Sequence, residues 1–178
     1  MYRIVSHPIG LDAVESILGP NLLVWGSRWF SKMPSDSTYL SWHQDVTYRR
    51  LHPPNVTTAW IALSESIPKN GCMRVIPHTH QGDLLPQRET YAPDNAHSRG
   101  QEIVAEVDDS RAVDLVLKPG ELSLRHIGIV HGSNRNRSDQ PRIGIAVRYV
   151  IPEVIQDDTD QPRSSGVKHR RSWACYRA

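Results

Sequence analysis

Residues 112–150, AVDLVLKPGELSLRHIGIVHGSNRNRSDQPRIGIAVRYV, decide the fold expected for this chain of 178 residues. Short apolar or alternating runs are separated here by turn-forming segments, which is the pattern of short β-strands. Within this stretch, LVLKPGELSL at residues 115–124 predicts a hairpin, because Pro119 fixes φ at one turn position and Gly120 accepts a positive φ. The stretch therefore predicts a structure built from short antiparallel strands.

The same pattern extends toward the N-terminus, where one segment has helical periodicity instead. Residues 10–21, GLDAVESILGPN, place apolar side chains at helical spacing, and Gly19 and Pro20 end the run. Strand-like runs follow at residues 21–30, 39–46, 55–64, 72–77, 112–117, 120–126, 128–133 and 142–150. Many short strands with little helix are typical of a β-sandwich or barrel. Residues 81–109 form a long polar segment, and loops of that length are often lids over a site.

The bulk composition is that of a single globular domain. Apolar residues make up 38% and charged residues 22% of the chain, and the net charge is only +2, too small to indicate a nucleic-acid partner. No apolar stretch approaches the ~20 residues of a membrane span, and no signal-peptide pattern opens the chain. Cys72 and Cys175 match no metal or redox spacing. We therefore expect a cytoplasmic protein without nucleic-acid or membrane partners.

A His-x-Asp pair lies in the strand-like run SWHQDV. Side chains at positions i and i+2 of a strand point to the same face, so His43 and Asp45 would offer two ligands to one metal ion. A buried structural hydrogen bond is the competing interpretation of this pair. His131 adds a second imidazole from a later strand-like run. Two histidines and one carboxylate form the facial triad of non-haem Fe(II) oxygenases, which leaves three coordination positions open.

The strand expected at residues 142–150 indicates an anion site. Its alternation groups Arg142 with Gly144 and Ala146 on one face and apolar residues on the other. A permanently charged guanidinium beside two small side chains leaves room for an anion, and arginine is suited to bidentate binding of a carboxylate. For Arg142 taken alone, a structural ion pair at a strand edge is as compatible with the sequence as an anion site.

Three ordered motifs resemble the phytanoyl-CoA dioxygenase family of Fe(II)/2-oxoglutarate-dependent oxygenases. They are WHQD at residues 42–45, TAWIALSESIPKNGCMRVIPHTH at 58–80 and HGSNRNRSDQPRIGIAVRY at 131–149. The resemblance implies a double-stranded β-helix, a cupin-like jelly roll, which agrees with the strand pattern. We therefore expect one dioxygenase domain over residues 1–178, with a helical lead-in at 1–20, a β-helix core at 21–152 and a polar basic tail at 153–178.

The resemblance implies a cofactor set and the residues that hold it. His43, Asp45 and His131 would bind Fe(II), and O₂ would serve as cosubstrate beside 2-oxoglutarate. Arg142, eleven positions after His131, would hold the distal carboxylate of 2-oxoglutarate. Ser133, two positions after His131, is expected as a second contact to that carboxylate.

Further residues are expected around the pocket. Trp60 is a candidate wall of the cosubstrate pocket, although a plain core tryptophan is equally compatible with the sequence. Candidate contacts in the substrate pocket are Gln44, Tyr48, His52 and Lys32. Candidate contacts to a negatively charged substrate are Arg49, Arg50 and Arg88. His78 and His80 stand where the family often has IPGSH, and we expect a surface or hydrogen-bonding role for them.

The resemblance implies hydroxylation of a small-molecule or acyl substrate with release of succinate and CO₂. Asp45 favours hydroxylation over halogenation, because halogenases of this fold replace the carboxylate by a small residue. A cupin-like metalloenzyme that does not use 2-oxoglutarate is a second hypothesis. A third is a binding protein that is inactive or depends on a partner subunit, because family members carry a longer region before the metal motif. A homo-oligomer is a further possibility.

Overall fold

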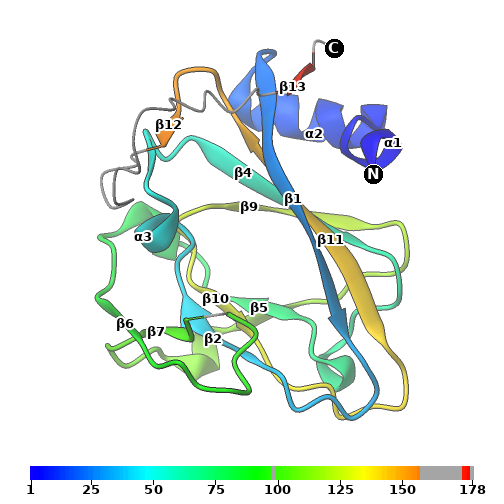
Figure 1. Cartoon of the computed structure of the whole chain (residues 1–178), viewed down its shortest axis with the longest axis vertical. Coiled ribbons are helices and arrows are strands. Elements are labelled where there is room, and N and C mark those ends of the chain that lie inside the picture. Colours follow the sequence, from blue (N-terminus) through cyan, green and yellow to red (C-terminus); the bar gives the residue numbers. More distant parts are fainter. Residues whose placement is uncertain (98, 157–173, 177–178) are drawn as a thin grey trace, which may run out of the picture.

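The computed structural model describes residues 1–97, 99–156 and 174–176, which form antiparallel β-sheets with short helices (Figure 1). The helices are α1 (Tyr2–Val5), α2 (Pro8–Leu18) and α3 (Val46–Arg49), with 3-10 turns η1 (Pro68–Asn70), η2 (Thr79–Gln81) and η3 (Asp109–Arg111). The strands are β1 (Leu22–Lys32), β2 (Leu40–His43), β3 (Leu51–His52), β4 (Val56–Ala62), β5 (Met73–Val75), β6 (Gln87–Glu89), β7 (Gln101–Ile103), β8 (Val113–Leu115), β9 (Leu122–His126), β10 (His131–Ser133), β11 (Arg142–Val150), β12 (Ile155–Gln156) and β13 (Ala174–Tyr176).

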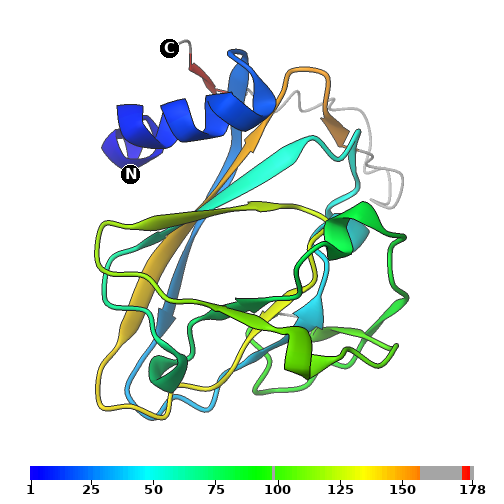
Figure 2. The same cartoon turned by 180° about the vertical axis from the view of Figure 1, so that it is seen from behind.

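Two antiparallel sheets form the body of the molecule. The larger sheet has the strand order β13-β1-β11-β4-β9, and the smaller has the order β2-β10-β5-β8. From β8 to β11, successive strands alternate between the two sheets, which is the winding of a double-stranded β-helix. Figures 1 and 2 show the two sheets from opposite sides. The predicted jelly-roll fold is confirmed.

The turn predicted within residues 115–124 forms, but the hairpin prediction is wrong. Gly120 has φ of 88°, and the N–H of Glu121 donates to the carbonyl of Lys118 at 3.0 Å. However, β8 pairs with β5 in the smaller sheet, whereas β9 pairs with β4 in the larger one. Turn chemistry determines that the chain reverses, but packing between the sheets determines which strands pair. This turn therefore carries the chain from one sheet to the other.

The helix predicted near the N-terminus is present as α2, and its apolar side packs against the larger sheet. Gly19, with φ of 85°, follows its last residue. Val14 of α2 belongs to the same buried cluster as Ile145 and Tyr149 of β11. The hydroxyl of Tyr149 donates to the carbonyl of Val5 at 2.8 Å. Burying each large apolar side chain contributes about 1.5–3 kcal/mol, so this cluster anchors the outward face of β11.

The other face of β11 points between the two sheets. Arg142, Gly144, Ala146 and Arg148 alternate along it, which extends the predicted face by one arginine. Trp60 of β4 lies directly opposite Ala146 in the register. A Cβ added at Gly144 would lie 2.6 Å from Cη2 of Trp60, so only glycine fits under this indole. The tryptophan therefore fills the middle of the inward face.

The segment at residues 81–109 is more regular than a lid loop is expected to be. It contains β6 and β7, which pair with each other. The N–H of Tyr39 donates to Asp94 O at 2.9 Å, and the N–H of Ala96 donates to Tyr39 O at 2.8 Å. These bonds hold the segment along the start of β2, the strand that ends at His43. The segment therefore lies where a lid over the metal motif is expected.

Parts of the predicted tail at residues 153–178 pair with strands of the body. β12 pairs with β3, and β13 pairs with β1 at the edge of the larger sheet. Residues 157–173 and 177–178 of this tail lie outside the described residues. The division into lead-in, core and tail stays a prediction. In the described part of the chain, every helix is too short or too polar to cross a membrane.

Candidate metal centre

Two histidines face each other across neighbouring strands of the smaller sheet. His43 ends β2 and His131 begins β10, and the antiparallel register places them directly opposite. Their ring centroids are 4.0 Å apart. The exposed fractions are 1% for His43 and 3% for His131. The register thus joins two imidazoles that are 88 positions apart in the sequence.

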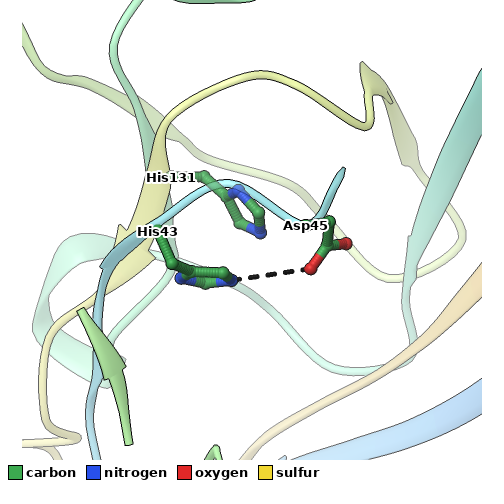
Figure 3. A group of neighbouring side chains, drawn as sticks. All are labelled: His43, Asp45 and His131. Carbon is green, nitrogen blue, oxygen red and sulfur yellow. Dashed lines mark ion pairs between the residues drawn. The ribbon is translucent and has the colours of Figure 1, made fainter. Parts of the chain in front are cut away.

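Asp45 completes the group, although not in the way that strand alternation predicts. β2 ends at His43, and Asp45 has helical backbone angles, φ −59° and ψ −32°, at the N-cap of α3. The prediction that both side chains share one strand face is therefore wrong, because the chain turns into a helix between them. Oδ1 of Asp45 still lies 3.7 Å from Nε2 of His43 (Figure 3). One possible ligand atom from each of the three residues lies within 4.8 Å of the others.

Backbone carbonyls orient both imidazole rings. Nδ1 of His43 lies 2.7 Å from the carbonyl of Ser41, and Nδ1 of His131 lies 3.0 Å from the carbonyl of Ile129. A carbonyl only accepts, so each Nδ1 carries the proton and each Nε2 is left as the acceptor. This is the tautomer of a histidine that ligates metal through Nε2.

Electrostatics favour the protonation states that a metal needs. Burial alone would raise the pKa of Asp45, but the interactions with His43 and the Arg125 guanidinium hold it well below its usual value. Burial, Arg125 and His43 lower the pKa of His131 well below its usual value. An ionised carboxylate and a neutral imidazole are the forms that bind a divalent cation. The donor set therefore fits a facial-triad metal.

A second polar group lies at the start of β11. Arg142 is 3% exposed, and its guanidinium lies 4.5 Å from the ring centroid of Trp60. Its Nε has no hydrogen-bond partner among the described residues. Lys32 lies opposite Arg142 in the register, and its Nζ donates to Oγ of Ser133 at 2.8 Å. Burial and the nearby Arg142 lower the pKa of Lys32 to about 7.

One cavity brings the expected metal and cosubstrate residues together. Its lining includes His43, Asp45, His131, Arg142, Ser133 and Trp60. Lys32 is not part of the lining and lies behind Ser133. Strand alternation and the β2–β10 register therefore bring both groups to a common space between the sheets.

The remaining predicted pocket residues do not line this cavity in the described structure. Gln44 is buried, and its amide bridges two backbone groups: Nε2 donates to Gly128 O at 2.7 Å, and Oε1 accepts from Leu85 N at 2.9 Å. It therefore ties the lid segment to the turn before β10. His52 lies exposed on β3. The side chain of Tyr48 is outside the described part of the structure.

Of the three arginines predicted to contact a negatively charged substrate, only one lines the cavity. Arg49 lines the cavity, whereas Arg50 does not. Arg88 is exposed and pairs with Glu102 at 3.4 Å. His78 and His80 are exposed and outside the lining, in agreement with the surface role expected of them.

Sequence reasoning missed several residues of the lining, and three of them lie beside the triad. Nε2 of His97, from the lid segment, lies 2.9 Å from Nε2 of His43, and no motif surrounds it in the sequence. Arg125 and Arg148 are also in the lining, and both are buried. The sequence did contain a signal for Arg148, because this residue continues the alternation that begins at Arg142 along β11.

A double-stranded β-helix with a buried His-Asp-His group defines a class of metalloenzyme folds, and one family within that class matches this chain. The sequence model of the phytanoyl-CoA dioxygenase (PhyH) family matches residues 1–144. The chain therefore belongs to this family. The match begins at residue 1, so it includes the helical lead-in that the motifs alone left out.

Known relatives are similar over most of the chain but are longer. The peroxisomal phytanoyl-CoA dioxygenase of Rattus norvegicus is 29% identical over 153 residues, which are 84% of this chain and 45% of the relative. A probable alpha-ketoglutarate-dependent hypophosphite dioxygenase of Stutzerimonas stutzeri is 28% identical over 81% of this chain and 50% of its own length. The apo structure of the non-heme monooxygenase ThoJ is 36% identical, with a TM-score of 0.78, over 87% of this chain and 56% of that one. The chain thus spans about half the length of the curated relatives it matches.

Proposed function

We infer that the chain is an Fe(II)/2-oxoglutarate-dependent dioxygenase that hydroxylates a small-molecule or acyl substrate. The observation that carries this proposal is the buried group His43, Asp45 and His131, with both Nε2 atoms left as acceptors. The named activities of the relatives support it, since the rat and Stutzerimonas proteins are both named as dioxygenases.

Each part of the lining has a role in this proposal. The triad would hold Fe(II) through two imidazole nitrogens and one carboxylate oxygen, which leaves three positions open. Arg142 would bind the distal carboxylate of 2-oxoglutarate, and its buried Nε supports this role because a buried donor without a partner is costly. Ser133 and Trp60 would shape the same end of the cavity. When bound, iron and 2-oxoglutarate supply oxidation by O₂ with release of succinate and CO₂.

The residues around the cofactor site would also exclude water. The two sheets and the lid segment bury all three triad residues to 3% exposure or less. Shielding of a reactive centre is the part of oxygenase chemistry that the protein itself must provide. A homo-oligomer or partner subunit stays a prediction. The cytoplasmic location also stays a prediction, and the rat relative is named peroxisomal.

Anaerobic titration with Fe(II) and 2-oxoglutarate tests this function without knowledge of the substrate. A visible metal-to-ligand charge-transfer band is expected when both components are present. The band should disappear in His43→Ala and in Asp45→Ala. His7→Ala is the matched control, because His7 is an exposed histidine before α2 and should leave the band unchanged.

The same titration separates the alternatives. Bound metal without a band on adding 2-oxoglutarate would support a cupin-like metalloenzyme instead. Failure to bind any metal would support a binding protein that is inactive or incomplete without a partner. The cavity favours the dioxygenase over the cupin-like enzyme, because Arg142 gives a dicarboxylate a second anchor beside the metal.

A further inference from the structure

The buried amine of Lys32 donates to three acceptors behind the Arg142 end of the cavity. Its Nζ lies 2.8 Å from Oγ of Ser133 and 3.4 Å from the carbonyl oxygen of the same residue, and it also donates to the carbonyl of Asn134. Lys32 is 4% exposed and is not itself part of the cavity lining. An amine has three hydrogens to donate only as the charged ammonium, so these contacts fit the protonated lysine.

The contact with Lys32 restricts the direction of the Ser133 hydroxyl. A hydroxyl has one proton to donate and two lone pairs that accept. Since Oγ accepts from Lys32, its own proton must point elsewhere, and among the described residues Oγ has no hydrogen bond besides the one from Lys32. Ser133 is 5% exposed and lines the cavity. The cavity is therefore where an acceptor for this proton can bind.

A second buried donor lines the same cavity. Arg142 is 3% exposed, and its Nε has no hydrogen-bond partner among the described residues. A buried donor without an acceptor is costly, whereas a carboxylate has two oxygens that accept. The distal carboxylate of 2-oxoglutarate, bound at this end, would accept from both the Arg142 guanidinium and the Ser133 hydroxyl.

The backbone that carries Lys32 is held in place from two sides. β1 and β11 run side by side, and their register places Lys32 opposite Arg142 (Figure 1). Asn136, in the loop between β10 and β11, is 2% exposed, and its Nδ2 donates to the carbonyl of Lys32 at 3.1 Å and to that of Met33 at 3.0 Å. The loop that follows Ser133 thus fixes the end of β1, so the amine and the hydroxyl keep their relative positions.

We propose that Lys32 is a positioning residue for the cosubstrate, which orients the Ser133 hydroxyl so that it donates to the distal carboxylate of 2-oxoglutarate. This inference rests on the proposed function and deepens it. With a neutral amine, two hydrogens would go to the two carbonyls, and the nitrogen lone pair would accept the Ser133 proton and turn it away from the cavity. The ammonium therefore helps to select a keto acid that carries a second carboxylate.

Two keto acids test this role through the charge-transfer band, without turnover. 2-Oxopentanoate has the carbon chain of 2-oxoglutarate with a methyl group in place of the distal carboxylate, and it keeps the 1-carboxylate and 2-oxo group that chelate iron. The full chain is loaded anaerobically with Fe(II) at pH 6.5, below the pKa of about 7 of Lys32, and is titrated with each keto acid. The unmodified chain should bind 2-oxoglutarate at least about a hundredfold more tightly than 2-oxopentanoate.

Variants assign the preference for 2-oxoglutarate to Lys32 acting through Ser133. Lys32→Met should lower this preference at least about tenfold and change the affinity for 2-oxopentanoate less than about threefold. Lys32→Gln should do the same, because its amide has two N–H donors for the two carbonyls and none for the hydroxyl. Ser133→Ala should also lower the preference about tenfold, and adding Lys32→Met to it should lower the preference less than about threefold further. Lys69→Met removes an equal charge from an exposed side chain and should change nothing.

The outcomes separate this inference from the proposed function. No preference in the unmodified chain, or an unchanged preference in both Lys32 variants, would overturn the positioning role and leave the dioxygenase standing. An equal loss for both keto acids would make Lys32 a structural residue, and a further tenfold loss on adding Lys32→Met to Ser133→Ala would mean that its charge acts without the hydroxyl. Either result also overturns the inference alone. Bound metal without a band for either keto acid in the unmodified chain would overturn the dioxygenase and the inference with it.

Discussion

The two ends of β11 carry the same side chain on the same face, but their surroundings differ. Arg142 lies opposite Lys32 and beside Ser133 and Trp60, and the described lining near it contains no carboxylate. Arg148 lies near Oδ2 of Asp45, in a group with two further arginines. In the described lining, the Arg142 end is therefore cationic without a carboxylate, whereas the arginines at the Arg148 end surround the carboxylate of Asp45.

This difference gives the two ends of one strand different parts in the proposed function. An isolated guanidinium at the Arg142 end needs an anion from outside the protein, as the proposed cosubstrate provides. At the Arg148 end, Asp45 pairs with the arginines and would also share its carboxylate with the metal. Gly144 and Ala146 between the two arginines leave room for the indole of Trp60, which lies between the two ends, so the ends can be tested separately.

The largest expected effect is at the Arg142 end. Arg142→Ala should weaken 2-oxoglutarate binding by about a hundredfold, because removing one partner of a buried charge pair costs about 2–5 kcal/mol. The measurement is the charge-transfer band as a function of 2-oxoglutarate at fixed Fe(II). Arg142→Lys should recover part of the loss, since it keeps the charge but not the bidentate geometry. Arg148→Gln should change this affinity less than about threefold, and an equal loss there would contradict the separation of the two ends.

The next effect concerns the glycine between the two ends. Gly144→Ala should lower stability by about 1–3 kcal/mol, because the added methyl meets the indole of Trp60. Thermal unfolding would show this as a Tm lower by about 2–4 °C for each kcal/mol. Gly26→Ala is the matched control: it lies opposite Arg148 on β1, and a Cβ there meets nothing within 4 Å. An unchanged Tm in Gly144→Ala would mean that Trp60 does not fill the inward face.

The sequence predicted the Arg142 end better than the Arg148 end, for physical reasons. Alternation along a strand is a local property, so the face shared by Arg142, Gly144 and Ala146 could be read directly. The cluster around Asp45 depends on the β11–β4–β9 register and on the start of α3, which are set by packing over long sequence separations. The same limit explains why a correct turn at Gly120 was assigned to a hairpin that does not form.

Lys32 makes 2-oxoglutarate binding at the Arg142 end sensitive to pH. Its pKa of about 7 lies far below the usual value because of burial and the nearby Arg142. A carboxylate bound at this end would raise that pKa, so binding takes up a proton, and affinity falls as pH rises above 7 by at most about tenfold per unit. Calorimetry of 2-oxoglutarate binding at pH 8, in buffers with different ionisation heats, measures this uptake.

The control for this pH effect is Lys32→Met, which should bind 2-oxoglutarate without proton uptake. If the binding heats of the unmodified chain do not depend on the buffer, Lys32 does not respond to the cosubstrate. The distal carboxylate of 2-oxoglutarate would then bind elsewhere.

The smallest effect concerns His97, which reaches the metal site from the lid segment. Its Nε2 lies 2.9 Å from Nε2 of His43, the same atom that the proposed metal needs. Metal binding must therefore break this contact, whose net contribution is about 1 kcal/mol, and His97→Ala should bind Mn(II) about fivefold more tightly. His126→Ala, a half-buried histidine beside His80 and outside the cavity lining, should leave Mn(II) affinity unchanged.

Competition with a metal indicator measures these affinities, and the sign of the His97 effect decides its role. Burial and the neighbouring His43 lower the pKa of His97 to about 3, so its ring is neutral at pH 7 and is itself a competent ligand. Weaker Mn(II) binding in His97→Ala would make it a fourth ligand and leave too few open positions for a chelating cosubstrate and O₂. Tighter binding would make it a lid contact that the metal displaces. The group of three within 4.8 Å does not include His97, and this geometry favours the second role.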